Sequence, residues 1–450
     1  PVAKHPGSLV YAGTVAEEGA CIIRVEKASG SGRYDRIVRM IEESEKLKST
    51  AEDKAARMAD RLVPYTLGGT ALTYLLTRNV TKMLSVLMVD FSCALKLAIP
   101  IAVLSAMRES SGYHISVKGG RFLEAVAKAD TIVFDKTGTL TYATPTVAAV
   151  VPFGGHDEAE MLRLAACLEE HYPHSMANAV VAEAKRHGLT HEEYHSQVQY
   201  VVAHGIASTL YGKAVRVGSR HYIECDEGID LSPLEAEIDA QAQMGRSLLY
   251  LAIDGKLAGF LAIEDPLRPE CPQVLKQLEE LGFRRILMLT GDDERTARAV
   301  AGKLGLKEYR AQVLPADKAD VIADLTAQGC KVLMVGDGIN DAPALSASHV
   351  GVAMCDGADL AREVANVLLT RPDLSGLITA RLLGRATLRR IHVNFAATML
   401  LNSMFLAGGL FMILTPGVSA LLHNLTTLGV TLNAMRPHLP GRHARQLEAA

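Results

Sequence analysis

The most restrictive feature of this sequence is a stretch of 45 consecutive residues, 391–435, that contains no Asp, Glu, Lys or Arg. A helix that crosses a bilayer needs about 20 apolar residues, so this stretch is long enough for two membrane helices. Thr415, Pro416 and Gly417 lie near its middle and are typical of a connecting turn. Basic residues flank the stretch on both sides, which predicts that both flanks are cytoplasmic. They are Arg381, Arg385, Arg389 and Arg390 before it and Arg436, Arg442 and Arg445 after it.

Two further membrane helices are expected earlier in the chain, over Leu62–Thr77 and Met83–Met107, with Arg78 in the loop between them. The second of these helices contains Asp90 and Lys96, and ionisable groups inside a membrane are usually functional. Lys96 is expected either to pair with Asp90 or to extend toward the membrane surface. The sequence therefore predicts membrane helices in two pairs, one on each side of a long polar region.

The polar region between the two pairs, residues 112–387, alternates short β-rich runs with helical patterns. Such alternation predicts a doubly wound parallel sheet. The expected strands are Thr131–Phe134, Ile286–Leu289 and Val332–Val335, and two of the expected helices are Pro269–Leu281 and Asp293–Leu304.

The segment from Val147 to Ile263 differs in composition and residue pattern from the rest of the polar region. It is richer in His and Glu and contains hairpin-like runs at Lys213–Gly218 and Tyr250–Ile263, so we interpret it as a domain inserted between two halves of the sheet. The first 45 residues have β character, and a helix of mixed charge follows them. These expected elements are strands over Leu9–Val15 and Ala20–Glu26 and a helix over Tyr34–Asp60.

The composition excludes several classes of protein. With 49% hydrophobic residues, the chain is too apolar to be disordered. A net charge of −3 gives no electrostatic support to nucleic-acid binding, so no nucleic-acid partner is expected. The seven cysteines are far apart and form no C-x-x-C pair, so neither a disulfide framework nor a cysteine zinc cluster is expected.

Acidic residues follow the expected strands at the points where open α/β sheets bind their ligands. Asp135 ends the first strand, and a carboxylate in that place can attack a phosphoryl group to form an aspartyl phosphate. Asp337 and Asp341 follow another strand and offer the oxygen ligands that Mg²⁺ prefers. Thr290 and Gly291 offer a hydroxyl and a backbone turn for phosphate oxygens, and Lys318 is a candidate cation for charge on the phosphoryl group.

Three motifs taken together resemble the signature set of the P-type ATPases, cation pumps that form a phospho-aspartate on a haloacid-dehalogenase-like sheet. They are Asp135-Lys136-Thr137-Gly138-Thr139, Thr290-Gly291-Asp292 and Gly336-Asp337-Gly338-Ile339-Asn340-Asp341. The resemblance extends over nearly the whole chain, and the ordered set is far more specific than any single motif. It implies that Asp135 is the phosphorylated nucleophile and that ATP with Mg²⁺ supplies the phosphoryl group.

The same resemblance implies roles for the other motif residues. Asp135, Asp337 and the Thr137 carbonyl would hold Mg²⁺, and Thr290, Gly291 and Lys318 would contact the phosphoryl group. The catalytic set is completed by Lys136, Asp292, Asn340 and Asp341, and Asp265 matches a hinge motif.

The residue type at position 137 distinguishes the pumps of this family from the phosphatases of the same fold. Soluble relatives of this fold generally carry a second Asp two positions after the nucleophile, as general acid and base. The threonine found here would leave the aspartyl phosphate long-lived, which a pump needs in order to couple chemistry to motion. A phosphatase of the haloacid-dehalogenase type is therefore the disfavoured alternative.

The two membrane helices after the catalytic region resemble the heavy-metal (type IB) group, because calcium and sodium pumps have six there. The insert supports this reading. Glu169 and His174 match the family's adenine-binding motif, although Ser175 replaces the expected Pro. Gly205 and Gly218 match two glycine motifs of the nucleotide site, in which Ala203 and Ser219 replace the expected Gly and Asn. The resemblance implies ATP binding and leaves its affinity open.

The ion-binding motif departs further from the family pattern. Type IB pumps have Cys-Pro-Cys in the helix before the phosphorylation domain, and only Cys93 is present here. One thiolate is a poor site for Cu(I), which favours several sulfur ligands. A mixed set of sulfur, nitrogen and oxygen ligands suits a divalent ion such as Zn²⁺, Mn²⁺, Co²⁺ or Fe²⁺. The polar candidates beside Cys93 are Asp90, Ser92, Asn402, His423, Asn424 and Thr427.

The expected organisation is a carboxy-terminal portion of a pump. Its domains are a partial actuator domain (1–45), a linker helix and membrane pair with the ion motif (46–112), the phosphorylation domain (113–146 and 264–375) around a nucleotide-binding domain (147–263), a linker helix with the last two membrane helices (376–436), and a cytoplasmic tail (437–450). The actuator loop Thr-Gly-Glu is not in the sequence, so the expected partner is a missing amino-terminal portion of the same pump.

The expected location is the lipid bilayer of the plasma (inner) membrane, with the catalytic domains in the cytoplasm and the ion exported from it. One alternative stays open beside the phosphatase, a transport-incompetent fragment that binds ATP. The catalytic subunit of a potassium pump is disfavoured, because Cys93 and the two final membrane helices favour the metal group.

Overall fold

The computed structural model describes Arg24 and residues 51–89, 92–170, 175–189, 199–201, 205–210, 212–337, 339–355 and 359–439. The described residues from Ala51 onward divide into two compact units. The first unit contains the described residues of 131–348 and 359–364, and the second contains 51–130, 349–355 and 365–439. The strands expected over Leu9–Val15 and Ala20–Glu26 lie outside the described residues.

Four parallel strands of the first unit lie in the order β11-β2-β9-β10 in its described part. They are β2 (Thr131–Asp135), β9 (Arg285–Leu289), β10 (Glu308–Arg310) and β11 (Val332–Gly336). All residues of β2 and β11 are buried, as expected for parallel strands covered on both faces. The helices of this region are α9 (Cys271–Glu280), α10 (Glu294–Leu304), α11 (Lys318–Ala327), α12 (Ala342–Ala347) and α13 (Asp359–Val364).

The strand register brings the carboxyl ends of β11, β2 and β9 to one edge of the sheet. Phe134 is the partner of Val335 on one side, and Asp135 is the partner of Leu289 on the other. The chain segments that follow these strands therefore start side by side. They include the loop η1 (Lys136–Leu140) after β2 and the turn η4 (Ile339–Asp341) after β11.

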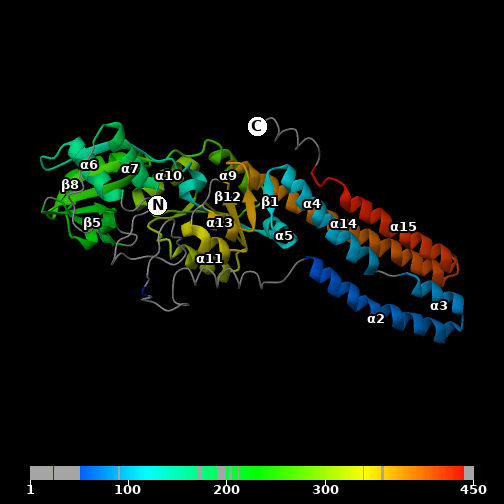
Figure 1. Ribbon diagram of the computed structural model, residues 1–450. Helices are drawn as coiled ribbons and strands as arrows, with labels where there is room; N and C mark the ends of the chain where they lie inside the picture. Colours follow the sequence, from blue (N-terminus) through cyan, green and yellow to red (C-terminus); the bar gives the residue numbers. More distant parts are fainter. Residues whose placement is uncertain are drawn as a thin grey trace. The chain divides into compact units, whose positions relative to one another are not determined.

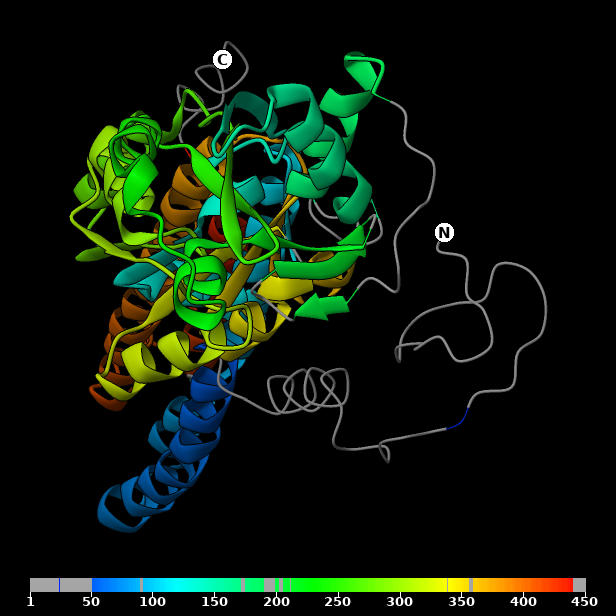
Figure 2. The ribbon, with the colours of Figure 1, turned by 90° about the vertical axis from the view of Figure 1, so that its left-hand side faces the viewer.

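The chain between β2 and β9 forms the expected insert, an antiparallel sheet with the order β3-β8-β7-β6-β5-β4 in the described residues. Its strands are β3 (Thr146–Pro152), β4 (Gln199–Val201), β5 (Gly205–Leu210), β6 (Lys213–Gly218), β7 (Ser247–Ile253) and β8 (Lys256–Glu264). The other elements are α6 (Glu158–Glu169), α7 (Ser175–Arg186), η2 (Tyr222–Asp226), η3 (Ser232–Leu234) and α8 (Glu235–Gln243). Figure 2 looks onto this insert, whose strands are green.

The insert has a hydrophobic core on each face of its sheet. Leu249, Leu251 and Ile253 of β7 pack in the same core as residues of α6 and α7. The alternate residues Leu248 and Tyr250 pack in a second core with residues of η2 and α8. This period-2 pattern buries both faces of β7. The strand orders of the two sheets confirm the expected doubly wound parallel sheet with an α+β insert.

The second unit consists mainly of helices. Its elements are α2 (Ala51–Thr77), α3 (Val80–Leu87), α4 (Ser92–Gly112), β1 (Ile115–Val117), α5 (Gly120–Lys128), β12 (Val350–Met354), β13 (Val367–Leu369), α14 (Ser375–Leu410) and α15 (Pro416–Met435). Helix α4 packs against α2, α14 and α15, and α14 and α15 run side by side (Figure 1). The turn between them is closed by Thr415, whose hydroxyl accepts a hydrogen bond from the Val418 N–H, with Pro416 in the first helical turn.

Polarity is inverted in this helical unit. Large apolar side chains that are exposed in the described residues belong almost entirely to α2, α3, α4, α14, α15 and their turns. Those in the first unit are Tyr142, Phe153, Met244 and Leu314. The side chains of Asn394, Thr398 and Asn402 are buried at a four-residue spacing on α14, and Ser419 and His423 are buried on α15. Such an apolar exterior around polar interior groups suits a lipid environment better than water.

The two expected pairs of membrane helices are supported to different degrees. Judged by length and composition, α14 is the one helix in the described ranges that could cross a membrane. The expected single helix over Met83–Met107 is wrong, because α3 ends at Leu87 and α4 begins at Ser92. No Gly or Pro stands between these two helices, so the usual sequence signals of a break are missing. The expected helix over Leu62–Thr77 is part of the longer α2.

Candidate functional site

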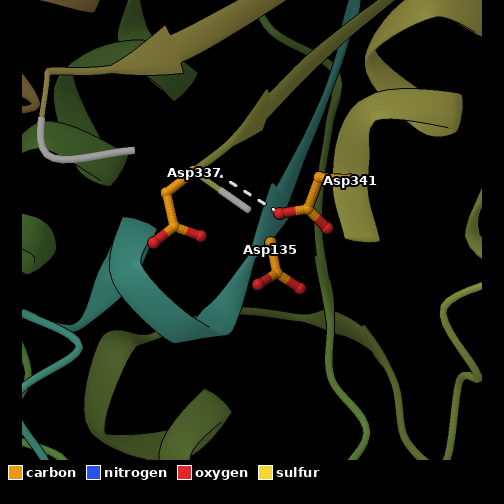
Figure 3. Close-up of side chains that lie close together, drawn as sticks. All are labelled: Asp135, Asp337 and Asp341. Atoms are coloured by element: carbon orange, nitrogen blue, oxygen red, sulfur yellow. Dashed lines mark hydrogen bonds between the residues drawn. The ribbon is translucent and has the colours of Figure 1, made fainter. Parts of the chain in front are cut away.

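Three carboxylates meet at the edge where β2 and β11 end. Asp135 is the last residue of β2, Asp337 follows β11, and Asp341 precedes α12 (Figure 3). One oxygen of each lies within 4.8 Å of the others. The backbone N–H of Asp337 donates to Oδ2 of Asp341 at 3.3 Å, which fixes the turn between them. The structure thus brings together three residues that the sequence assigned to one site.

Gly138 allows the loop after β2 to approach Asp337 closely. Its φ is +73°, and a Cβ at this position would lie 1.5 Å from Oδ2 of Asp337. No other residue type fits there, both because of the space and because of the left-handed backbone. The Gly138 N–H donates to the Thr141 hydroxyl at 3.0 Å, which closes the loop.

Lys318 is the cation of this cluster. It stands in the first turn of α11, and its Nζ lies 2.6 Å from Oδ1 of Asp135 and 2.7 Å from Oδ1 of Asp341. Burial by itself would lower the pKa of Lys318, but the charges of the two aspartates raise it well above its ordinary value. The lysine therefore stays charged at any physiological pH.

One lysine does not balance three carboxylates, and the pKa values reflect this. Burial and the charge of Asp341 raise the pKa of Asp135 to about 6, although Lys318 and Lys136 act in the opposite direction. Burial and the charges of Asp341 and Asp135 raise the pKa of Asp337 to about 7. A cluster with this excess of negative charge favours a further cation.

Mg²⁺ fits the residues that are present. It prefers carboxylate and phosphate oxygens, and it usually takes one or two carboxylates from the protein. Asp135 and Asp337 are the carboxylates that would hold it, because both oxygens of Asp341 already have partners, Oδ1 with Lys318 and Oδ2 with the Asp337 N–H. Lys318 contacts Asp135 through Oδ1. Bound there, the ion would offset the negative charge that raises the pKa values of both aspartates.

A second buried cluster centres on Asp292. Its Oδ2 lies 2.5 Å from Lys136 Nζ and accepts a hydrogen bond from the Thr290 hydroxyl at 2.7 Å. Its Oδ1 accepts from the Ser247 hydroxyl at 2.6 Å. Burial would raise the pKa of Asp292, but the charge and hydrogen bond of Lys136 lower it overall. The Thr290 hydroxyl, which was expected to contact phosphate, is thus directed to Asp292 in this structure.

Comparison with known proteins agrees with this geometry. Residues 129–349 match the family described as haloacid dehalogenase-like hydrolase. The crystal structure of a zinc-transporting PIB-type ATPase in its E2.Pi state covers 91% of this chain and 68% of that chain, with a TM-score of 0.66 and 31% sequence identity. The chain belongs to the heavy-metal (type IB) P-type ATPases.

Two curated P-type ATPases of this kind show how far the similarity extends. The copper-transporting P-type ATPase of Rhizobium leguminosarum bv. viciae is 33% identical over 97% of this chain and 54% of its own length. The manganese-exporting P-type ATPase of Mycobacterium bovis is 34% identical over 97% of this chain and 61% of its own length. The chain therefore spans little more than half the length of these relatives.

The remaining catalytic candidates of this P-type ATPase lie at the same edge or close to it. Thr137 is half-buried in the loop after β2, Gly291 is exposed in the turn after β9, and Asn340 is exposed on η4. Asp265 lies just beyond β8 and is mostly buried, and this burial is the largest influence raising its pKa.

The nucleotide candidates lie on the insert. Gly205 and Gly218 are direct partners across β5 and β6. A Cβ on Gly205 would fall 2.3 Å from the Val217 carbonyl oxygen and 2.9 Å from the Gly218 Cα, so the two strands need glycine there. Glu169 ends α6 and is buried. His174 lies outside the described residues, as do Ala203 and the side chain of Ser175.

The ion-site candidates are separated by the structure. His423 is buried on α15, and its Nδ1 lies 3.3 Å from Oδ1 of Asn402 on α14. Asn424 is exposed on another face of α15, and Cys93 is exposed on α4. Asp90 and the Ser92 side chain lie outside the described residues. Lys96 forms an ion pair with Asp60 of α2 at 2.7 Å, and its expected pairing with Asp90 stays a prediction because Asp90 is not described.

Sequence reasoning missed two residues of this site. Ser247 begins β7 and lies 3.3 Å from Lys136 Nζ as well as bonding to Asp292. Arg268 follows β8 and is completely buried against the loop after β2. The one available signal was an arginine three residues after Asp265, inside the hinge motif.

Proposed function

We propose that this chain carries the catalytic and ion-conducting parts of an ATP-driven pump that exports a divalent transition metal through an aspartyl phosphate. The observation that carries the proposal is the cluster of Asp135, Asp337, Asp341 and Lys318 at one sheet edge. The helical unit supports the proposal as well, because buried polar side chains inside an apolar helix bundle are typical of ion transport.

The proposed chemistry is transfer of a phosphoryl group to Asp135. A carboxylate oxygen of Asp135 attacks the γ-phosphorus of ATP, the bond from that phosphorus to the bridging oxygen breaks, and ADP leaves. Lys318 stabilises the ionised form of Asp135 and stands where it can offset the charge on the phosphoryl oxygens. Mg²⁺ held by Asp135 and Asp337 would neutralise charge on the same oxygens.

Thr137 supports a pump rather than a phosphatase. It occupies the position, two residues after the nucleophile, at which a phosphatase of this fold needs its acid and base. A threonine hydroxyl has no pKa near neutrality and cannot activate water as a carboxylate does. Slow hydrolysis of the aspartyl phosphate is the expected consequence.

The proposed cargo is Zn²⁺, Mn²⁺, Co²⁺ or Fe²⁺. Relatives are named as transporters of copper, manganese and zinc, so family membership alone does not select the ion. The helical unit offers a sulfur on Cys93 of α4, and it offers a nitrogen and an oxygen on His423 and Asn402, which contact each other between α15 and α14. Such a mixed set favours a divalent ion over Cu(I). We further propose the inner membrane as the location, with the catalytic domains in the cytoplasm.

The test is acid-stable phosphorylation of the detergent-solubilised chain by ATP and Mg²⁺ across a panel of metals. A hydroxylamine-sensitive label that needs one divalent metal is expected, and Asp135→Asn should abolish it. Asp324→Asn, an exposed aspartate of α11, is the matched control and should leave it unchanged. Rapid hydrolysis of small phosphate esters without a label would establish the phosphatase instead. ATP binding without any label would establish a transport-incompetent fragment.

A further inference from the structure

Arg268 is a fully buried arginine that lies outside the carboxylate cluster. It stands four residues after the end of β8, where the chain returns from the insert to the parallel sheet. Its relative exposure is 0%, which is unusual for a residue that always carries a positive charge. Burial of such a charge is tolerated only when many hydrogen-bond acceptors surround it.

The acceptors of Arg268 are backbone carbonyls of the loop that follows Asp135. Its Nε donates to the Thr139 carbonyl at 2.9 Å and to the Thr141 carbonyl at 3.1 Å, and its Nη2 donates to the Gly138 carbonyl at 3.2 Å. Its guanidinium carbon lies 4.8 Å from the centre of the Tyr142 ring. One side chain thus holds three carbonyl groups of this loop, those of Gly138, Thr139 and Thr141.

The backbone around Arg268 joins the same two segments. The Arg268 N–H donates to the Leu140 carbonyl at 2.9 Å, and the Tyr142 N–H donates to the Pro266 carbonyl at 3.2 Å. Thr141 and Leu267 form an antiparallel bridge. These segments are the outgoing and returning connections of the insert, so Arg268 fixes both to each other.

The position of this loop determines the geometry of the catalytic edge. Gly138, whose carbonyl Arg268 binds, approaches Asp337 so closely that no side chain fits between them. A shift of the loop by a few tenths of an ångström would therefore alter the separation between Asp135 and Asp337. The planar fork of an arginine can hold carbonyls in several directions at once, whereas a lysine ammonium holds them as a single point.

We propose that Arg268 is a positioning residue for phosphoryl transfer, which fixes the loop 138–141 relative to Asp337 and couples it to the insert. The catalytic part of this inference rests on the proposed function. Its structural consequence is independent of any activity, because loop order in the full chain can be measured directly.

The experiment compares Arg268→Lys with the wild-type chain and with Arg285→Lys as matched control. Arg285 is an ion-paired arginine of the same unit, at the opposite end of β9 from the catalytic edge. Hydrogen–deuterium exchange is followed by mass spectrometry for peptides covering 137–142 and 332–336. Phosphorylation is measured as a function of Mg²⁺ concentration, and thermal unfolding reports the fold.

Arg268→Lys is expected to speed exchange over 137–142 with little change over 332–336. Phosphorylation should fall by about tenfold or more, in line with the loss of charge-assisted hydrogen bonds, and its Mg²⁺ half-saturation should rise. Arg285→Lys should match the wild type in all three measurements. Tyr142→Leu keeps the arginine and removes its ring contact, so it should give the same pattern with a change of about two- to fivefold.

Unchanged exchange over 137–142 in Arg268→Lys would overturn the proposal. So would a phosphorylation rate and Mg²⁺ half-saturation equal to those of the wild type in a variant that exchanges faster. If Arg268→Lys unfolds, Tyr142→Leu decides the question by the same criteria. If the wild-type chain takes no label, the proposed function fails, whereas the exchange measurement still decides whether Arg268 holds the loop.

Discussion

At the catalytic edge, the space between neighbouring residues limits which residue types fit, and Gly138 is the clearest case. Gly138→Ala would place a methyl group on Asp337, so phosphorylation should fall by about a hundredfold or more, the scale expected when reacting groups move by 1 Å. Gly255→Ala is the matched control, since Gly255 has the same φ of +73° but nothing within 4 Å of its Cβ position. Phosphorylation by ATP measures both. Equal losses in the two variants would mean that backbone strain, and not the approach to Asp337, is responsible.

The nucleophile predicts a pH dependence. Asp135 must be ionised to attack, and burial with the charge of Asp341 raises its pKa to about 6 in the metal-free chain. The initial rate of phosphorylation should therefore fall as the pH is lowered, with a midpoint below about 6, because the Mg²⁺ that the reaction needs favours the ionised form of Asp135. Rapid-quench labelling between pH 4 and 8 measures the profile. A rate that is flat over this whole range would contradict the assignment of Asp135.

The residues that the structure brings together as the sequence predicts are those whose position depends on local order along the chain. Asp135 ends β2 and Asp337 follows β11, and the strand-end rule is sufficient to bring them together. Arg268 and Ser247 act through groups more than a hundred positions away in the chain. Their role depends on tertiary packing that no local pattern records, so sequence reasoning missed them.

At the scale of elements, β2, β9 and β11 were predicted within one residue of their bounds, because buried parallel strands are continuous apolar runs. The short strand β10 (Glu308–Arg310) was not predicted, because it is polar and only partly buried. The membrane helices were predicted less well, because hydropathy reports that a run is apolar and does not report where its backbone breaks. The break between α3 and α4 falls within the run over Met83–Met107 and contains neither Gly nor Pro.

The end of α15 is held by two charged residues of other helices. Glu109 of α4 accepts hydrogen bonds from the backbone N–H groups of His438 at 2.6 Å and Leu439 at 2.9 Å. Arg390 of α14 donates to the carbonyls of Asn433 at 3.0 Å and Pro437 at 2.9 Å. The chain after α15 is thus fixed to both neighbouring helices.

Removing one of these groups should destabilise the helical unit. Glu109→Ala leaves two buried N–H groups without this acceptor, which should lower the free energy of unfolding by about 1–3 kcal/mol. Glu124→Ala, which removes an ion pair to Lys128 within α5, should cost only about 0.3–0.5 kcal/mol. Thermal unfolding in one detergent compares the two variants. A loss no larger for Glu109→Ala would show that solvent satisfies the freed groups.

At the scale of the whole molecule, the two units follow opposite rules of polarity. The first has an apolar core and carries few exposed large apolar side chains, whereas the second exposes them along most of its helices and buries polar ones. The residues proposed for phosphoryl transfer lie in the first unit, and the candidate ion ligands lie in the second. A pump requires that the second unit control the first, so a change at an ion ligand should alter phosphorylation without touching the carboxylate cluster.

His423 and Asn424 allow this coupling to be tested with neighbouring residues. His423 is buried and bonded to Asn402 across two helices, while Asn424 is exposed on the same helix. If His423 binds the transported ion, His423→Ala should remove the metal stimulation of phosphorylation, whereas Asn424→Ala should retain it within about twofold, as is usual for an exposed substitution. Binding of a fluorescent ATP analogue should be unchanged in both variants, because the insert is intact. Equal stimulation in the two variants would place the ion elsewhere, and loss of analogue binding in His423→Ala would indicate a general folding defect instead of a lost ion ligand.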